Sequence, residues 1–331
     1  MALNLRTKKS EEWWQALPFP FSSFAVSEGS RPEGFRFSRH IINAEAELFG
    51  RKVVACGEAD TPELAITKAI AELLERSALL TYSLDHPGNA SSSNGWAAHS
   101  DVESARTAAS LELCERDAVL AQWYTATPFL EIPESELPQS IQQWRSSELT
   151  ISEFPILRVL LSTCGLGPSV TCLFMNERGF GVSSHSTKST LAESIDSAIA
   201  ETCRAAHHTL RKAFWRDTLA LKSGEATDVT PGTHSVYYAY HEPLPNWMFG
   251  ESVSWNDADI LWRSGIESAL ALETQFQVLL ESPVVVGFAR NPLALPLNWG
   301  TTKIESVLET AAGKRLAAQT PEWNLKPHII S

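Results

Sequence analysis

The chain has 331 residues, a net charge of −12, and 44% apolar and 20% charged residues. This composition is typical of a folded globular protein and excludes a disordered chain. The acidic balance argues against a nucleic acid or an anionic membrane as a partner, since both attract a positive surface. No apolar run reaches the roughly 18 residues of a membrane span, and the N-terminus shows no signal-peptide pattern. We therefore expect a cytoplasmic protein.

The five cysteines are few, odd in number and without C-x-x-C spacing. In a chain of this kind they indicate buried thiols, not a disulfide or zinc framework. They are Cys56, Cys114, Cys164, Cys172 and Cys203.

In the first half of the chain, weak periodicity predicts an irregular segment over residues 1–50, and two helices are predicted at 62–82 and 101–124. A capping residue, a proline and an acid at residues 60–63 mark the start of the first helix. Three prolines make 125–150 a connecting segment.

In the second half, strands and helices alternate loosely, which predicts an α/β or α+β fold. Strands are expected at 154–161, 170–175, 179–184, 235–240 and 283–289, helices at 190–215, 257–280 and 301–319, and a tail at 320–331.

An internal repeat is the most informative feature of the sequence. Residues 65–80 and 105–120 align without a gap, and nine of their sixteen positions are identical. A weaker third copy lies at 194–204, with Glu201 in the place of Glu112.

Two glutamates in each strong copy stand three residues apart, so they share one helix face. The pairs are Glu72 with Glu75 and Glu112 with Glu115. A small alanine, Ala69 or Ala109, precedes each pair on that face, where it lets another group approach the helix closely.

These helices carry apolar residues on nearly every side, so we expect them to be largely buried. Buried charges need compensation. Arg–Glu pairing would be structural, whereas a bound Mg²⁺ suits hard carboxylate ligands and would bridge them to substrate phosphates, with Arg116 binding phosphate oxygens. The residues alone leave both readings open.

The stretch at 92–124, SSNGWAAHSDVESARTAASLELCERDAVLAQWY, resembles the signature of the YcaO family. Residues 65–76 and 194–201 are similar to the family's first and third glutamate helices. The resemblance covers roughly residues 50–300. It implies one YcaO-like domain over 1–331, an α/β fold of repeated units around an ATP site that is not a P-loop.

The resemblance also implies the site residues. The Mg²⁺ ligands would be Glu72, Glu75, Glu112, Glu115 and Glu201. The nucleotide contacts would be Arg116, Asn94, Ser100, Lys68 and Arg204. Lys68 stands where the family often has serine, and Arg204 or Lys188 could replace the arginine that is absent at Ser197.

The implied activity is ATP-dependent activation of a peptide backbone amide. A nucleophile attacks the amide carbonyl, ATP phosphorylates the resulting oxyanion, and phosphate leaves. We expect azoline-forming cyclodehydration of Cys, Ser or Thr. Azoline-forming members end in a Pro-rich tail that reaches the active site, whereas this chain ends in Ile329-Ile330-Ser331. Thioamide or amidine formation is therefore an alternative.

A third possibility is a scaffold or docking subunit that keeps the fold without catalysis. Two departures from the family motivate it: Ser197 lacks the family's arginine, and Glu58 stands in the middle of a run that resembles Gly-Lys-Gly in the family. The partners implied by the family are a precursor peptide, a separate leader-recognition protein and a second copy of the chain in a homodimer.

Overall fold

The computed structural model describes residues 17–86, 93–224, 229, 231–281, 284–297, 304–318, 323–324 and 326–330. Its contacts divide the chain into two compact units. The first comprises Met1–Ser30, Ser38–Ala109 and Gln275–Ala289, and the second comprises Arg31–Phe37, Ser110–Thr274 and Arg290–Ser331. The prediction of one domain over the whole chain stays a prediction.

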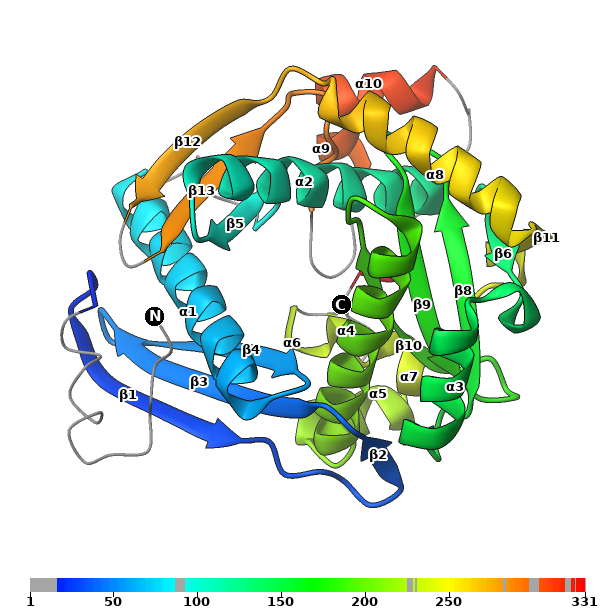
Figure 1. The fold of residues 1–331 in the computed structure, drawn as a ribbon, viewed down its shortest axis with the longest axis horizontal. Helices are drawn as coiled ribbons and strands as arrows, with labels where there is room; N and C mark the ends of the chain where they lie inside the picture. The colour runs from blue at the N-terminus through cyan, green and yellow to red at the C-terminus, as the bar shows by residue number, and fades with distance from the viewer. Residues whose placement is uncertain are drawn as a thin grey trace. The chain divides into compact units, whose positions relative to one another are not determined.

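The first unit contains an antiparallel sheet of order β1-β3-β4, with helix α1 packed against β3 and β4 (Figure 1). The bounds are β1 Phe21–Glu28, β3 His40–Leu48, β4 Arg51–Ala59 and α1 Pro62–Asp85. Thr61 caps α1, and its hydroxyl accepts a hydrogen bond from the Leu64 N–H. A second sheet, of order β12-β13-β5, consists of β12 Gln275–Leu280, β13 Val285–Arg290 and β5 Trp96–His99.

A very close helix–strand approach explains one of the small residues in the repeat. A Cβ added to Gly57 of β4 would lie 1.9 Å from the Ala65 carbonyl oxygen and 2.4 Å from the Ala69 amide nitrogen of α1. Ala69 is fully buried. The expectation that a small residue at Ala69 admits a close neighbour is confirmed, and that neighbour is a strand.

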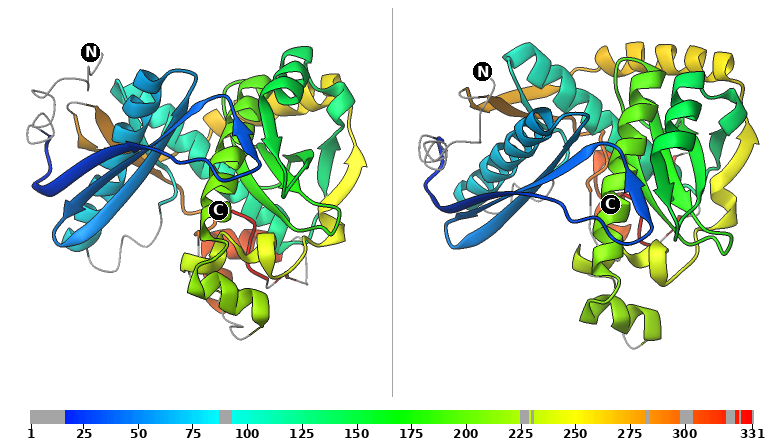
Figure 2. Two further views of the ribbon diagram at one scale, coloured as in Figure 1. Left: turned by 90° about the horizontal axis from the view of Figure 1, so that it is seen from below. Right: turned by 60° about the horizontal axis from the view of Figure 1, so that its bottom comes forward.

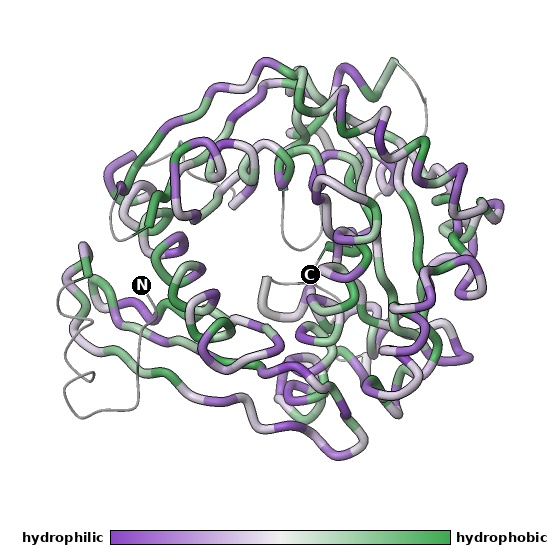
Figure 3. Tube along the Cα trace, viewed as in Figure 1, coloured by the Kyte–Doolittle hydropathy of each residue, from purple (hydrophilic) through white to green (hydrophobic). Residues whose placement is uncertain are grey.

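The second unit contains a five-stranded sheet of order β10-β9-β8-β6-β11, antiparallel except for the β11–β6 pair. The bounds are β6 Phe129–Ile132, β8 Ile156–Ser162, β9 Ser169–Met175, β10 Gly181–Ser186 and β11 Phe249–Ser252. Strands β8 and β9 are mostly apolar (Figure 3) and largely buried. Helix α4, Leu191–Lys212, packs on β9 and β10.

Helix α2, Val102–Tyr124, starts in the first unit and continues into the second from Ser110. Its C-terminal half contributes Trp123 and Tyr124 to the second core, together with Leu160 and Leu173 from the sheet. The remaining elements are β2 Phe35–Phe37, η3 Glu134–Glu136, α3 Gln139–Glu148, β7 Leu149–Ile151, α5 Arg216–Ser223, α6 Pro231–His234, α7 Tyr237–Tyr240, η4 Asn246–Met248, α8 Trp255–Leu270, α9 Ile304–Leu308 and α10 Ala311–Ala317.

The mixed α/β class and the main helices are confirmed, as are the strands around 154–184. Four local predictions are wrong. Residues 21–48 contain three strands, not an irregular segment, and residues 125–150 contain β6, α3 and the start of β7, not a plain connection. Residues 237–240, predicted as part of a strand, are helical. The helix predicted at 257–280 ends at Leu270, after which β12 begins. Parts of the predicted helix at 301–319 and of the predicted tail at 320–331 lie outside the described residues.

Residues 326–330 are embedded in the second unit. The Trp123 indole N–H donates to the Lys326 carbonyl at 3.0 Å, and the Tyr238 hydroxyl donates to the Pro327 carbonyl at 2.7 Å. His328, Ile329 and Ile330 are buried. This segment is therefore part of the core.

All five cysteines lie in described parts of the chain as thiols, and four of them are buried, which confirms the expectation for those four; Cys164 is half-buried. Among the described residues, no helix is both long and apolar enough to span a bilayer.

Candidate functional site

Helix α2 places three charged side chains of the repeat on neighbouring positions in the second unit. The Arg116 Nε lies 3.8 Å from a Glu112 carboxylate oxygen and 3.7 Å from one of Glu115. Glu112 and Glu115 stand three residues apart, and Arg116 follows Glu112 by four, which is the spacing of helix neighbours. One arginine contacts both glutamates, which is consistent with the prediction that they share a helix face.

Glu115 also connects α2 to the end of β10. Its Oε2 accepts a hydrogen bond from the Thr187 backbone N–H at 2.8 Å, and the carboxylate is buried. Thr187 is itself held by a hydrogen bond from its hydroxyl to the Pro168 carbonyl at 2.9 Å. A backbone N–H fixed by the sheet therefore orients the central carboxylate.

Burial raises the pKa of Glu115 to about 8. The positive charge of Arg116 opposes this rise, the carboxylate of Glu201 adds to it, Lys188 opposes it and Glu112 adds to it. The predicted carboxylates of Glu112 on α2 and Glu201 on α4 therefore both act electrostatically on Glu115 within the second unit. Such a group favours an additional cation.

Helix α4 supplies Glu201, whose Oε1 accepts a weak hydrogen bond from the Ser197 hydroxyl at 3.4 Å. Ser197 therefore contacts the glutamate that follows it one turn later. Arg204 is half-buried on the same helix. Lys188 has its backbone N–H bound to the Ser194 hydroxyl at 2.8 Å, while its side chain is exposed.

The first unit holds the remaining predicted ligands. One Glu72 oxygen lies 2.7 Å from Arg76, and the other accepts the Cys56 backbone N–H at 2.9 Å. Glu75, three residues later, is half-buried. Lys68 is exposed near the start of α1. The pairing of Glu72 with Arg76 and β4 matches the structural reading of the repeat.

The two predicted loop contacts are in different environments. Asn94 is half-buried just before β5. Ser100 is exposed, and its hydroxyl donates to Asp101 at 3.0 Å. Asp101 in turn accepts the Ser104 backbone N–H at 2.8 Å at the start of α2. Hydrogen bonds from Ser104 and Ser100 lower the pKa of Asp101. In this structure Ser100 thus takes part in a helix cap.

Sequence reasoning missed Asp117, the residue after the Glu-x-x-Glu-Arg run. Its fully buried carboxylate accepts the Leu166 and Leu295 backbone N–H groups, each at 2.8 Å, and pairs with Arg315 at 2.8 Å. Asp117 therefore anchors α2 against two loops and α10. An acid one position from a charged motif carries no sequence signal that separates an anchor from a ligand.

Strand β10 carries a row of buried polar side chains. The Ser183 hydroxyl donates to the Ile329 carbonyl at 2.7 Å, and a His185 nitrogen lies 3.4 Å from the same oxygen. Burial, together with the positive charge of Arg116, lowers the pKa of His185 to about 3. The embedded tail segment thus lies beside the strand that carries the Glu115 partner.

The donor chemistry of the second unit fits Mg²⁺, since Glu112, Glu115 and Glu201 offer hard oxygen ligands, and a bound cation would favour the ionised form of Glu115. Within the described part of the chain, however, no three acid, histidine or cysteine side chains are grouped closely enough to hold a metal ion. A metal would therefore need these carboxylates to turn from their arginine partners, with phosphates and water completing its shell.

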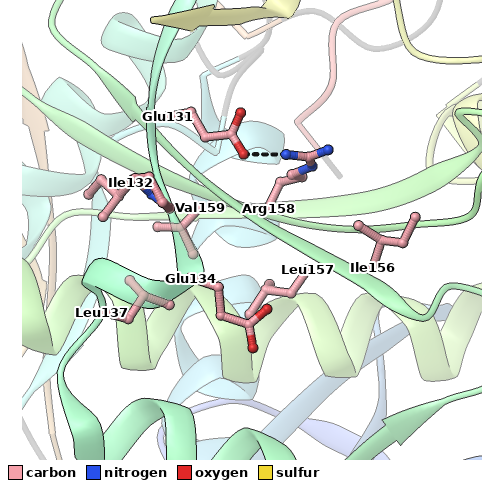
Figure 4. A pocket seen from close by; sticks show the side chains of 9 residues that line it. Glu131, Ile132, Glu134, Leu137, Ile156, Leu157, Arg158 and Val159 are labelled. Atoms are coloured by element: carbon pink, nitrogen blue, oxygen red, sulfur yellow. Dashed lines mark hydrogen bonds and ion pairs between the residues drawn. The ribbon is translucent and has the colours of Figure 1, made fainter. Parts of the chain in front are cut away.

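One pocket of about 270 Å³ lies elsewhere on the second unit, between β6, η3 and β8 (Figure 4). The Glu131–Arg158 ion pair closes one side, and Leu137, Leu157 and other apolar side chains line it. No predicted site residue is among those that line it.

Comparison with solved structures supports the fold. The chain is similar to YcaO from Methanopyrus kandleri bound with AMPPCP and Mg²⁺, at 15% identity and a TM-score of 0.54, covering 86% of this chain and 89% of that one. It is also similar to a heterocyclase in complex with substrate and cofactor, at 13% identity and a TM-score of 0.56. That match covers 82% of this chain but only 50% of the heterocyclase. No curated protein matches.

A family model matches residues 80–262, which is more than half of the chain and includes the second and third glutamate helices. Its description is YcaO cyclodehydratase, ATP- and Mg²⁺-binding. The chain belongs to the YcaO family of ATP- and Mg²⁺-binding proteins.

Proposed function

We propose that this protein activates a peptide backbone amide by ATP-dependent O-phosphorylation, and that the product is an azoline formed from Cys, Ser or Thr. The observation that carries the proposal is the electrostatically coupled group of Glu112, Glu115 and Glu201, with Arg116 between two of them. Family membership supplies the ATP and Mg²⁺.

In this proposal the second unit holds one Mg²⁺–phosphate assembly. Glu112, Glu115 and Glu201 would face the metal, and Arg116 would turn its planar guanidinium toward phosphate oxygens. Mg²⁺ supplies neutralisation of the charge that develops on the transferring phosphoryl group. The other predicted contacts stay predictions: Glu72, Glu75, Asn94, Ser100, Lys68 and Arg204.

The reaction balances without a redox partner. The side-chain nucleophile of the substrate releases its S–H or O–H proton and adds to the amide carbon, and the former carbonyl oxygen takes the γ-phosphoryl group of ATP, which releases ADP. Loss of phosphate with that oxygen, and of the proton on nitrogen, leaves the C=N bond of the ring. The chain's own residues bind, orient and neutralise.

The embedded tail favours the azoline product over a thioamide or amidine. The Ile329 carbonyl lies against Ser183 and His185 on β10, the strand that leads directly to Thr187 and Glu115. A tail held beside the proposed site is the feature expected of azoline-forming members, and its low proline content does not prevent this placement.

A second candidate is a docking subunit without catalysis. It is favoured by the arginine and backbone partners that the carboxylates already have, Arg116 for Glu112 and Arg76 with Cys56 for Glu72. In that case the role of these ion pairs is structural, and no nucleotide displaces them.

Calorimetric titration of ATP, with and without Mg²⁺, separates the two candidates. The test variant is Glu112→Gln with Glu115→Gln, which keeps side-chain size and removes both charges. The control is Glu103→Gln, an exposed glutamate in the first turn of the same helix. We expect Mg²⁺-dependent binding by the wild type and the control and its loss in the test variant, with unchanged thermal unfolding. Binding unaffected by the double substitution would refute the site, and no binding by any form favours the docking subunit.

The reaction itself is tested with a precursor peptide encoded beside the gene and carrying a heavy-oxygen label in the target amide. We expect the label in inorganic phosphate and the loss of one water per ring from the peptide. Sulfur or nitrogen incorporation would redirect the proposal to a thioamide or amidine. Phosphate without the label would contradict amide phosphorylation.

A further inference from the structure

Two adjacent aromatic side chains protrude from the second unit where α4 ends and α5 begins. Phe214 is 84% exposed and Trp215 is 58% exposed. Leu219, one turn after Trp215 on α5, is also exposed. In both views of Figure 2, α5 and the end of α4 project from the body of the second unit.

Basic residues surround these apolar side chains. Arg211 in the last turn of α4 and Arg216 in the first turn of α5 are exposed. The Lys212 amine lies 5.6 Å from the centre of the Trp215 ring, and burial lowers the pKa of Lys212. We call Phe214, Trp215, Leu219, Arg211 and Arg216 the aromatic corner.

The buried side of this corner already has packing and hydrogen-bond partners, so its exposed side is not needed for the fold. Ala213, Thr218 and Leu221 are buried beneath it. The Lys222 amine makes a cation–π contact 3.7 Å from the centre of the Tyr240 ring and donates to the Ala213 carbonyl at 3.3 Å. Exposed aromatic groups together with arginine are characteristic of the anchors of protein interfaces.

The charge of the aromatic corner indicates which kind of molecule would bind to it. The chain carries a net charge of −12, yet residues 211–222 contain four basic residues and one acid. A second copy docking through the same corner would oppose like charges, which disfavours a symmetric contact. The strong overall negative charge disfavours an anionic bilayer or a nucleic acid. A polypeptide with carboxylates flanking apolar side chains satisfies both features of the corner.

We propose that the aromatic corner is a docking surface for an acidic, apolar segment of a partner polypeptide. Phe214 and Trp215 bind its apolar side chains, and Arg211 and Arg216 pair with its carboxylates. The inference does not depend on the nucleotide chemistry proposed above.

The probe is a short fluorescein-labelled peptide of alternating Glu with Leu and Phe, and its matched control carries Gln in place of Glu. Binding to the full chain is followed by fluorescence anisotropy. We expect preference for the Glu peptide, weakened roughly tenfold or more in Phe214→Ser with Trp215→Ser, as for loss of aromatic anchors. The control variant is Ile260→Ser, a residue 65% exposed on α8 beside Asp257 and Asp259. It should bind like the wild type.

Charge reversal provides a second, independent test. Arg211→Glu with Arg216→Glu should weaken binding of the Glu peptide and strengthen binding of a Lys version of the same peptide. Equal binding of the Glu and Gln peptides, or binding that survives both double variants, would overturn the proposal. So would corner-dependent binding to vesicles of phosphatidylcholine and phosphatidylglycerol, or a wild-type dimer that dissociates in Phe214→Ser with Trp215→Ser. In each variant, ATP titration should match that of the wild type.

Discussion

The Glu115 carboxylate accepts the backbone N–H of Thr187 at 2.8 Å, which joins the middle of α2 to the residue after β10. This contact fixes a residue of the repeat by a group 72 positions away in the chain. Two properties of the Glu115 side chain could matter at this contact, its capacity to accept a hydrogen bond and its charge, and substitutions can separate them.

Substituting Glu115 in two ways should distinguish these properties. Glu115→Gln keeps an oxygen for the Thr187 N–H and removes a charge that burial and two nearby carboxylates disfavour, so we expect a free energy of unfolding within about 1 kcal/mol of the wild type. Glu115→Ala leaves a buried N–H without its acceptor and should lose about 1–3 kcal/mol. Urea unfolding measures both, with Glu103→Ala as the exposed control. Equal losses for Gln and Ala would show that the hydrogen bond is not what holds the contact.

Asp117→Asn should be among the most destabilising single substitutions in the second unit. The change removes the partner of Arg315 and alters a carboxylate that accepts two backbone N–H groups. Removing one member of a buried ion pair costs about 3–5 kcal/mol. Denaturant titration gives the value, and Asp101→Asn at the exposed α2 cap serves as the comparison. If Asp117→Asn with Arg315→Met recovers most of the loss, the unpaired arginine is the cause.

Gly57→Ala should destabilise the first unit through sterics alone. The new methyl group would meet the backbone of α1 at Ala65 and Ala69, so strand and helix must separate. Overpacking of this kind costs about 1–3 kcal/mol or more. Thermal unfolding of Gly57→Ala beside Arg51→Ala, an exposed position on the same strand, tests it. A melting temperature like that of the control would show that α1 can shift without cost.

The contribution of His234 to stability should be lost in mild acid, whereas Glu115, whose pKa burial raises, contributes in the opposite direction. Burial lowers the pKa of His234 to about 4, although hydrogen bonds with the backbone of His328 and Ile330 favour protonation. An unfolded histidine titrates near 6.5, so between pH 6.5 and about 4 the unfolded chain binds a proton that the folded chain does not. The contribution of His234, on the order of 3 kcal/mol in full, is therefore lost as the pH falls through this range.

Urea unfolding at about pH 7.5 and about pH 5 measures this dependence, and His234→Gln isolates its source. Glu115 is present in both proteins, so on going from about pH 7.5 to about pH 5 the change in the free energy of unfolding should be more unfavourable for the wild type than for the variant. His185 and His208, whose pKa values are also lowered by burial, to about 3 and about 4, keep a smaller dependence in the variant. An identical slope in both proteins would exclude His234 as a contributor.

Sequence patterns predicted the elements whose signals are local. The Thr61 cap and the proline after it located the start of α1, and helical spacing correctly paired Glu112 with Glu115. Residues 235–240 mislead because valine and tyrosine favour strands, yet Tyr237 and Tyr238 are buried in the core within α7. Packing overrides propensity there.

The parts of the site that sequence could not supply are those made by distant residues. Thr187 approaches Glu115 through its backbone, and a backbone N–H carries no residue identity. Asp117 is bound by Leu166, Leu295 and Arg315, which lie up to 198 positions away. The position of residues 326–330 depends on the hydroxyls of Ser183 and Tyr238, both of which look like ordinary strand residues in the sequence.

The embedded segment at 326–330 has a consequence for how the second unit forms. Its contacts with Trp123 and Ser183 span 203 and 146 positions, so they raise contact order, and topologies of that kind fold slowly. During synthesis, α2 and the central sheet are made long before their covering segment, and their aromatic core faces water until it arrives. Until residues 326–330 are made, the second unit therefore exposes apolar surface of the kind that chaperones bind.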